Sequence, residues 1–240
     1  MNELTAQTLN ILEKGVLEME GLISWGSNYT FLGRVCLGER EIDVIYKPRK
    51  GERPLWDFAP GTLCLRERAA FLVSETLQWR VVPPTILRDG PHGWGSVQQF
   101  IQHDPDRHYF TFEGQYQDQL QRIVLFDLLV NNADRKGGHV LIDDQEHLWS
   151  IDHGICFHSD YKLRSVIWEF AGQTIPGALL DDLRTFRQEL AEAENDITIT
   201  LTELLSPREV DAMGRRVGRL LRDNTFPRPG PGRHYPWPPV

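Results

Sequence analysis

One segment, residues 115–154, constrains this chain more than any other. Residues 115–132 follow a helical pattern, and Leu120, Ile123 and Val124 with residues 126–129 give a broad apolar face that is typical of a buried helix. Asp134 follows this helix, and Asp152 follows a short predicted hairpin over residues 139–152. Because a hairpin brings its two ends side by side, we expect residues 134–139 and Asp152 to share one cleft.

The first hundred residues predict a small, mostly antiparallel β unit. A short helix over residues 5–14 ends at Gly15, where a C-cap glycine is expected. Three strands over 16–24, 29–37 and 42–48 are separated by tight turns at 25–28 and 38–41. A loop rich in Pro and Gly precedes a helix within residues 62–79, which Thr62 can cap. Two further strands follow over 81–90 and 94–101.

The second half is predicted to be mainly helical. Helices are expected over residues 165–172, 175–194 and 206–224, and the last begins with a capping box of Ser206 and Glu209 around Pro207. The Pro-rich end is expected to be extended. We therefore predict a two-lobed α+β fold with an antiparallel β lobe (1–102) that carries one helix, a mostly helical lobe (103–225) and a tail (226–240).

Composition narrows the classes of function. The formal net charge of -8 argues against a nucleic-acid partner, because binding phosphates needs clustered Lys and Arg. The three cysteines are far apart, which disfavours a disulfide framework or a structural zinc site. No signal peptide and no apolar run of membrane-spanning length is expected from the sequence. These features predict a cytoplasmic protein without integral membrane association.

A β lobe with one inserted helix, followed by a helical lobe, is the plan of the protein-kinase-like fold. Phosphoryl transfer requires positioned charges, a metal clamp and a carboxylate that faces the acceptor. Lys47 ends the third strand and can reach nucleotide phosphates, and Glu67 on the next helix can pair with it. Asp134 then faces the acceptor, and Asp152 holds the metal. Lys50 and Glu75 are rivals to Lys47 and Glu67 that spacing alone does not exclude.

The segment "LLVNNADRKGGHVLI" followed by "LWSIDHG" resembles the catalytic region of phosphoinositide 3-/4-kinases and of HipA-type kinases. Similarity to the compact bacterial proteins grouped as phosphatidylinositol 3-/4-kinase-like spans roughly residues 16–160. The resemblance implies that Asp134 is the catalytic aspartate, that Asp152 binds metal, and that Lys47 and Glu67 form the phosphate-binding pair. It implies ATP with Mg²⁺ or Mn²⁺ as cofactors. It also implies a phosphate-covering loop at Gly26, Ser27 and Asn28, and an adenine-binding hinge at Gln99, Phe100 and Ile101.

Three positions depart from the family pattern. His139 stands where the pattern has a metal-binding Asn, and a neutral imidazole suits Mn²⁺ better than Mg²⁺. Lys136 replaces a His of the lipid kinases. The loop at Gly26 has a single glycine, and Asn28 could equally be a plain turn residue. Metal binding by His139 is therefore weighed evenly against a structural role.

Three functions remain open on the sequence. The first is an ATP-dependent phosphotransferase whose acceptor is a protein Ser/Thr hydroxyl or a small molecule. A lipid acceptor is less favoured because the segment directly after Asp152 offers only Lys162 and Arg164 for an anionic head group. The second is a nucleotide-binding pseudokinase or scaffold. The third is a metal-dependent hydrolase built on His139, Asp152, His153 and His158, whose spacing matches no helical His-x-x-x-His motif.

Overall fold

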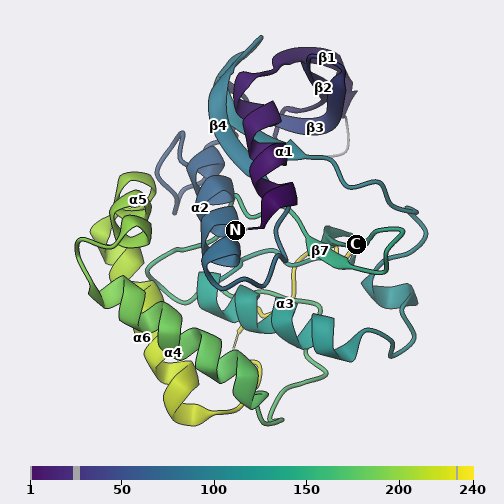
Figure 1. Cartoon of the computed structure of the whole chain (residues 1–240). Helices are drawn as coiled ribbons and strands as arrows, with labels where there is room; N and C mark the ends of the chain where they lie inside the picture. Colours follow the sequence, from purple (N-terminus) through teal and green to yellow (C-terminus); the bar gives the residue numbers. More distant parts are fainter. Residues whose placement is uncertain (1, 24–27, 231) are drawn as a thin grey trace.

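The structure is a computed structural model that describes residues 2–23, 28–230 and 232–240. The chain forms a smaller lobe, built from a sheet and helix α1, above a larger lobe made mostly of helices (Figure 1). This arrangement confirms the predicted α+β fold with two lobes. The boundaries at residues 102 and 225 stay predictions.

Within the described residues, the smaller lobe contains one five-stranded antiparallel sheet with the order β1-β2-β3-β5-β4. The first three strands form the predicted meander, and β5 inserts beside β3, so that Lys47 lies opposite Ser96. The strands are β1 (Val16–Ile23), β2 (Thr30–Leu37), β3 (Arg40–Pro48), β4 (Thr85–Gly90) and β5 (Gly93–Gln99).

Helix α1 (Glu3–Lys14) covers one face of this sheet. Its Ile11 and Leu12 are buried with Val35, Val44 and other sheet residues in a separate small core. Gly15 ends α1 as predicted, and its N–H donates to the carbonyl of Ile11 at 2.8 Å. A Cβ at Gly15 would lie 2.5 Å from the side chain of Val35, so the close approach of helix and strand requires glycine.

Helix α2 (Leu63–Thr76) links the two lobes. Its residues Ala69, Phe71 and Val73 are buried in the core of the larger lobe, although α2 also contacts β4 and β5. Thr62 holds the N-cap position of α2 as predicted, but its side chain makes no hydrogen bond to the helix. The Glu52 carboxylate instead accepts from the N–H groups of Leu63 and Cys64, which suits the positive end of the helix dipole.

The larger lobe is organised around α3 (Gln117–Val130), which is the buried helix that the sequence predicts. A short 3₁₀ helix, η3 (Gly137–His139), leads into the predicted hairpin of β6 (Val140–Ile142) and β7 (Leu148–Ser150). Helices α4 (Gly177–Ala191), α5 (Asp196–Leu204) and α6 (Pro207–Asp223) pack together against the α3 core, and the capping box of α6 is confirmed. None of the described helices is long and apolar enough to cross a bilayer.

Two helix predictions fail. Residues 165–172 form turns instead of a helix, because Ser165 bridges to Arg135 and its carbonyl accepts from the Trp168 indole. The side chains of Val166, Ile167 and Phe170 are nevertheless buried. Helix α5 was not anticipated, because its Ile-Thr alternation is typical of a strand. Asn195 caps α5 by accepting from the N–H of Ile197.

Candidate active site

A cavity of about 390 Å³ lies between the lobes, bounded by the sheet, α2 and the hairpin. A wider groove between α4 and α6 contains none of the predicted site residues. Gly26 and Ser27 lie outside the described residues. Every other predicted site residue lines the cavity, namely Asn28, Lys47, Glu67, Gln99, Phe100, Ile101, Asp134, His139 and Asp152.

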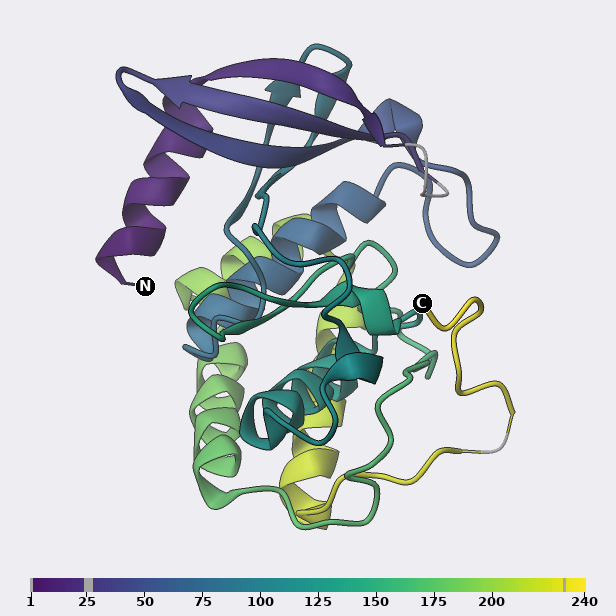
Figure 2. The ribbon, with the colours of Figure 1, turned by 90° about the vertical axis from the view of Figure 1, so that its right-hand side faces the viewer.

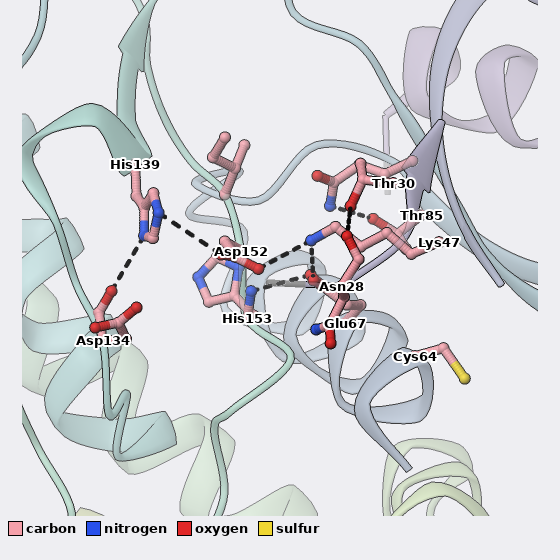
Figure 3. Close-up of polar contacts among 12 residues, drawn as sticks. Asn28, Thr30, Lys47, Cys64, Glu67, Thr85, Asp134, His139, Asp152 and His153 are labelled. Atoms are coloured by element: carbon pink, nitrogen blue, oxygen red, sulfur yellow. Dashed lines mark hydrogen bonds and ion pairs between the residues drawn. The ribbon is translucent and has the colours of Figure 1, made fainter. Parts of the chain in front are cut away.

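Lys47 connects both lobes at the floor of this cavity (Figure 3). Its Nζ lies 2.5 Å from Oε1 of Glu67 on α2 and 3.0 Å from Oδ1 of Asp152 after the hairpin. Burial alone would lower the pKa of Lys47, but the carboxylates of Asp152 and Glu67 outweigh burial and raise it. Lys47 is therefore a fixed cation in the cavity.

The predicted pairing of Lys47 with Glu67 is present in the structure. The rival Glu75 lies two turns further along α2, and the side chain of Lys50 lies beside Gly93. Neither residue lines the cavity. The second oxygen of Glu67 accepts from the backbone N–H of His153 at 3.0 Å. Glu67 thus holds Lys47 and the backbone after Asp152 in one arrangement.

Asp152 has a left-handed backbone conformation, with φ of 62°. Aspartate tolerates this region better than most residues, but the conformation still stores about 1 kcal/mol of strain. The attraction of Lys47 lowers the pKa of Asp152 against the opposing effect of burial. The strained turn therefore presents an ionised carboxylate to the cavity.

Asp134 follows the C-terminus of α3 and has the opposite electrostatic environment. Burial raises its pKa to about 6, and the negative charge of Asp152 adds to this effect, while Lys136 opposes it. The Nζ of Lys136 lies 3.6 Å from Oδ2 of Asp134. The two aspartates of the cavity thus have widely different pKa values, which is typical of a pair with different chemical roles.

His139 lies between the two aspartates (Figure 3). Its Nδ1 is 3.1 Å from the carbonyl oxygen of Asp134, which can only accept, so Nδ1 carries the proton and Nε2 keeps a lone pair. Burial lowers the pKa of His139 to about 4 and keeps the ring neutral. The lone pair of Nε2 faces Oδ2 of Asp152 at 3.6 Å.

Two electron-pair donors that face one another in this way fit a cation placed between them. His139 and Asp152 could therefore hold a divalent metal. Among the residues that the structure describes, no group of three or more His, Cys, Asp or Glu side chains could hold a metal by itself. A metal at this position would need further ligands from substrate phosphates or water, as Mg²⁺ sites of nucleotide enzymes commonly do.

A fully buried arginine supports the loop below these groups. The guanidinium of Arg135 contacts both carboxylate oxygens of Asp127 at 2.8 and 2.9 Å. It also donates to the carbonyls of His139 at 3.1 Å and Ile151 at 2.9 Å. Arg135 therefore fixes both ends of the hairpin relative to α3. The adjacent Asp134 and Arg135 were visible in the sequence, but these three partners of Arg135 were not.

The alternative hydrolase site is not assembled. Nε2 of His153 accepts from Arg135 at 2.9 Å, and burial, with a further contribution from Arg135, lowers the pKa of His153. Nδ1 of His158 accepts from the backbone N–H of Asp160. Both rings are therefore engaged in structural contacts, and neither lines the cavity that contains His139 and Asp152.

The predicted hinge is only partly available for a ligand. The N–H of Gln99 donates to the carbonyl of Pro84, and the N–H of Phe100 donates to the carbonyl of Asp43, each at 2.8 Å. Ile101 is buried at the cavity wall, and its N–H has no acceptor within the described part of the chain. Of the three predicted hinge N–H groups, only that of Ile101 can therefore donate to a bound molecule.

Asn28 is also partly engaged. Its side-chain oxygen accepts from the N–H of Arg53 at 2.8 Å, which attaches the start of β2 to the loop before α2. The N–H of Tyr29 donates to the carbonyl of Gly51 and adds a second link. Asn28 therefore supports the roof of the cavity, and a phosphate contact by its amide nitrogen stays a prediction.

Comparisons with known proteins agree with this arrangement. A family model described as phosphatidylinositol 3- and 4-kinase matches residues 70–190. Protein Rv2133c of Mycobacterium tuberculosis is 36% identical over 263 aligned residues, which cover 95% of this chain and 94% of that protein. The crystal structure of the Helicobacter pylori proinflammatory kinase CtkA is similar over 89% of this chain and 93% of that one, with a TM-score of 0.52 and 11% identity, so this likeness concerns the fold alone. The chain belongs to the phosphatidylinositol 3- and 4-kinase family.

Proposed function

We propose that the protein is an ATP-dependent phosphotransferase that transfers phosphate to an alcohol group. The observation that carries this proposal is the convergence of Lys47, Asp134 and Asp152 on one cavity. A fixed cation, an ionised carboxylate and a carboxylate of raised pKa are the groups that phosphoryl transfer uses. The family relationship supports a kinase-like phosphotransferase independently of this geometry.

ATP would bind across the hinge and the floor of the cavity. The N–H of Ile101, which has no acceptor among the described residues, can donate to a ring nitrogen of adenine, and Lys47 can contact the phosphates. A Mg²⁺ or Mn²⁺ ion held by Asp152 and His139 would neutralise charge on the phosphates. The ion pair with Glu67 keeps the ammonium group of Lys47 in place before the nucleotide arrives.

Asp134 would orient the acceptor hydroxyl and take its proton. A carboxyl with a pKa of about 6 is mostly ionised at neutral pH and is a stronger base than an ordinary aspartate. Lys136, 3.6 Å from Oδ2 of Asp134, is close enough to contact the transferred phosphoryl group. Both side chains belong to the loop that Arg135 fixes.

The acceptor is proposed to be a protein Ser/Thr hydroxyl or a small molecule. A lipid head group is less well supported, because Lys162 is already paired with Asp57 at 2.9 Å and lies over the ring of Trp56. This pairing leaves Arg164 as the other basic residue in the segment directly after Asp152.

Nucleotide binding tests the first part of the proposal. We expect Lys47→Met to weaken binding of a fluorescent ATP analogue at least ten-fold, because the cation on the phosphates is lost. Lys50→Met is the matched control, since Lys50 lies beside Gly93 and does not line the cavity. Equal affinity of the Lys47→Met variant and the unmodified protein would remove the phosphate-binding role of Lys47.

A second candidate function is a nucleotide-binding pseudokinase. It is favoured by one observation: His139 replaces the metal-binding Asn of the family pattern and leaves two protein donors for a metal. Binding of ATP without any phosphate release or transfer, in Mg²⁺ and in Mn²⁺, would support this candidate over the first.

A further inference from the structure

The end of the chain, residues 232–240, packs against the loop that carries Asp134. We call this last part of the predicted 226–240 segment the C-terminal tail. Figure 2 shows it in yellow, beyond α6, reaching a terminus beside the teal region that contains η3. The carbonyl of Pro239 accepts from the N–H of Gly137 at 2.8 Å, and Gly137 is three residues after Asp134. The tail therefore lies against residues 132–137, the loop that carries Asp134, which we call the catalytic loop.

A second contact places the tail on a strand-like edge. The N–H groups of Arg164 and Val166 donate to the carbonyls of Asn132 and Arg135 in the catalytic loop, at 2.9 and 3.1 Å. The N–H of Ser165, between them, donates to His234 of the tail at 3.0 Å. Because the backbone groups of an extended segment alternate in direction, residues 164–166 have the catalytic loop on one side and the tail on the other.

The contacts recognise the backbone of the tail more than its side chains. The carbonyl of His234 also accepts from the indole N–H of Trp168 at 3.3 Å. The acceptors in all three hydrogen bonds are main-chain carbonyls, at His234 and Pro239. Pro236 is buried between these two points, whereas Trp237 is 78% exposed. A chain of another sequence could make the same hydrogen bonds.

We propose that Gly137 and residues 164–166 form a docking edge for protein acceptors, which bind it as extended segments, and that the tail occupies this edge in cis. The inference rests on the proposed function and selects a protein over a small molecule as the acceptor. A small molecule lacks two carbonyls spaced like those of His234 and Pro239. An extended segment on this edge passes beside Asp134, where a Ser or Thr hydroxyl can be presented.

Occupation in cis has a quantitative consequence. A segment attached to its own binding site has an effective concentration in the millimolar range, so an external segment must compete against it. Releasing the tail should therefore strengthen binding of an external peptide. A purely structural tail would leave room only for its own sequence, so the probe must be a segment of different sequence.

The test is binding of a fluorescein-labelled peptide to the full-length protein. The peptide has the length of residues 232–240, keeps the proline of the buried position Pro236 and has alanine or serine at every other position. Pro236→Glu introduces a charge at the buried point of the tail and should release it. Pro238→Glu is the matched control, because Pro238 is exposed. We expect the peptide to bind Pro236→Glu at least ten-fold more tightly than it binds the unmodified protein, and Pro238→Glu to behave like the unmodified protein.

Equal peptide affinity of Pro236→Glu and the unmodified protein, or no binding by either at millimolar peptide, would overturn the inference. If Pro236→Glu does not fold, His234→Ala gives a second route, because it removes the tail ring that packs against Trp168 and leaves every residue of the docking edge unchanged. We expect a smaller gain in peptide affinity, of about three-fold, and an unchanged affinity would count against the docking edge.

Peptide binding needs no catalysis, so this test separates the two proposals. Phosphate transfer from ATP is measured on the same preparations. Transfer without peptide binding would remove the docking edge and leave the proposed function. Peptide binding by Pro236→Glu without any transfer would leave the docking edge and remove the proposed function.

Discussion

Replacing Asp134 with asparagine is expected to stabilise the fold while it removes the proposed base. The pKa of Asp134 is about 6 in the folded protein, against 3.8 for an ordinary aspartate. A difference of about two pKa units, at about 1.4 kcal/mol for each, means that keeping this carboxylate ionised costs the fold about 3 kcal/mol at neutral pH. Asparagine stays neutral and has nearly the same shape, so Asp134→Asn should gain about that free energy of unfolding.

The pH dependence distinguishes this explanation from a general packing effect. Below about pH 4 the carboxyl is protonated in both the folded and the unfolded chain, so the variant and the unmodified protein should be equally stable. Between the unfolded pKa of 3.8 and the folded pKa of about 6, the unfolded chain ionises first, and the unmodified protein loses stability as the pH rises. The advantage of the variant should therefore grow through this window and be complete above it.

The assay is urea denaturation of both proteins at pH 4, 5, 6, 7 and 8. Asp144→Asn is the matched control, because Asp144 is exposed in the hairpin turn and outside the cavity. The control should change stability by less than about 0.5 kcal/mol at every pH. A variant that is no more stable than the unmodified protein at pH 8, or a gain that does not depend on pH, would refute the reasoning.

Three further predictions concern single residues. His139→Asn should shift metal-dependent nucleotide binding from Mn²⁺ towards Mg²⁺, because an amide oxygen replaces the imidazole; an unchanged preference would show that His139 does not bind the metal. Arg135→Met should cost about 3–5 kcal/mol in urea denaturation, because it leaves the buried carboxylate of Asp127 unpaired, and a loss below about 1 kcal/mol would contradict this. Gly214→Ala should stabilise α6 by about 0.5–1 kcal/mol, since a Cβ there meets nothing within 4 Å; a loss on thermal unfolding would contradict it.

Periodicity in the sequence was enough to predict the sheet meander, the buried helix α3 and the hairpin that follows it. These elements have strong local patterns, namely alternation bounded by turn residues or an uninterrupted apolar face. Periodicity failed for residues 165–172, whose apolar side chains follow a helical pattern although Ser165 pairs with Arg135 in an isolated β-bridge. Periodicity also missed α5, because Ile-Thr alternation is typical of a strand. In the helix, the hydroxyl of Thr200 donates to the carbonyl of Asp196 one turn back.

The site was predictable as far as its charged groups follow the kinase order along the chain. Lys47, Glu67, Asp134 and Asp152 meet in one cavity because β3, α2 and the hairpin converge there. The availability of single backbone groups was not predictable from a motif. Gln99 and Phe100 donate to carbonyls of residues that are distant in the sequence or on a neighbouring strand, and the sequence contains no sign of these partners.

The cap of α2 shows the same limit. A threonine directly before a helix is a good local candidate for the capping hydrogen bond. The carboxylate of Glu52, eleven residues before Leu63, accepts from the helix N–H groups instead. That contact depends on how the Pro- and Gly-rich segment folds back over α2. Local propensity does not contain this information.

One measurement tests the central claim most directly. The purified protein is incubated with ATP labelled at the terminal phosphate, in Mg²⁺ and in Mn²⁺, and label on protein and released phosphate are followed beside the Asp134→Asn variant. The account predicts label or phosphate release by the unmodified protein and at least a hundred-fold less by the variant, which should be folded and more stable. No turnover in either metal, or equal turnover by the variant, would contradict a phosphotransferase that uses Asp134.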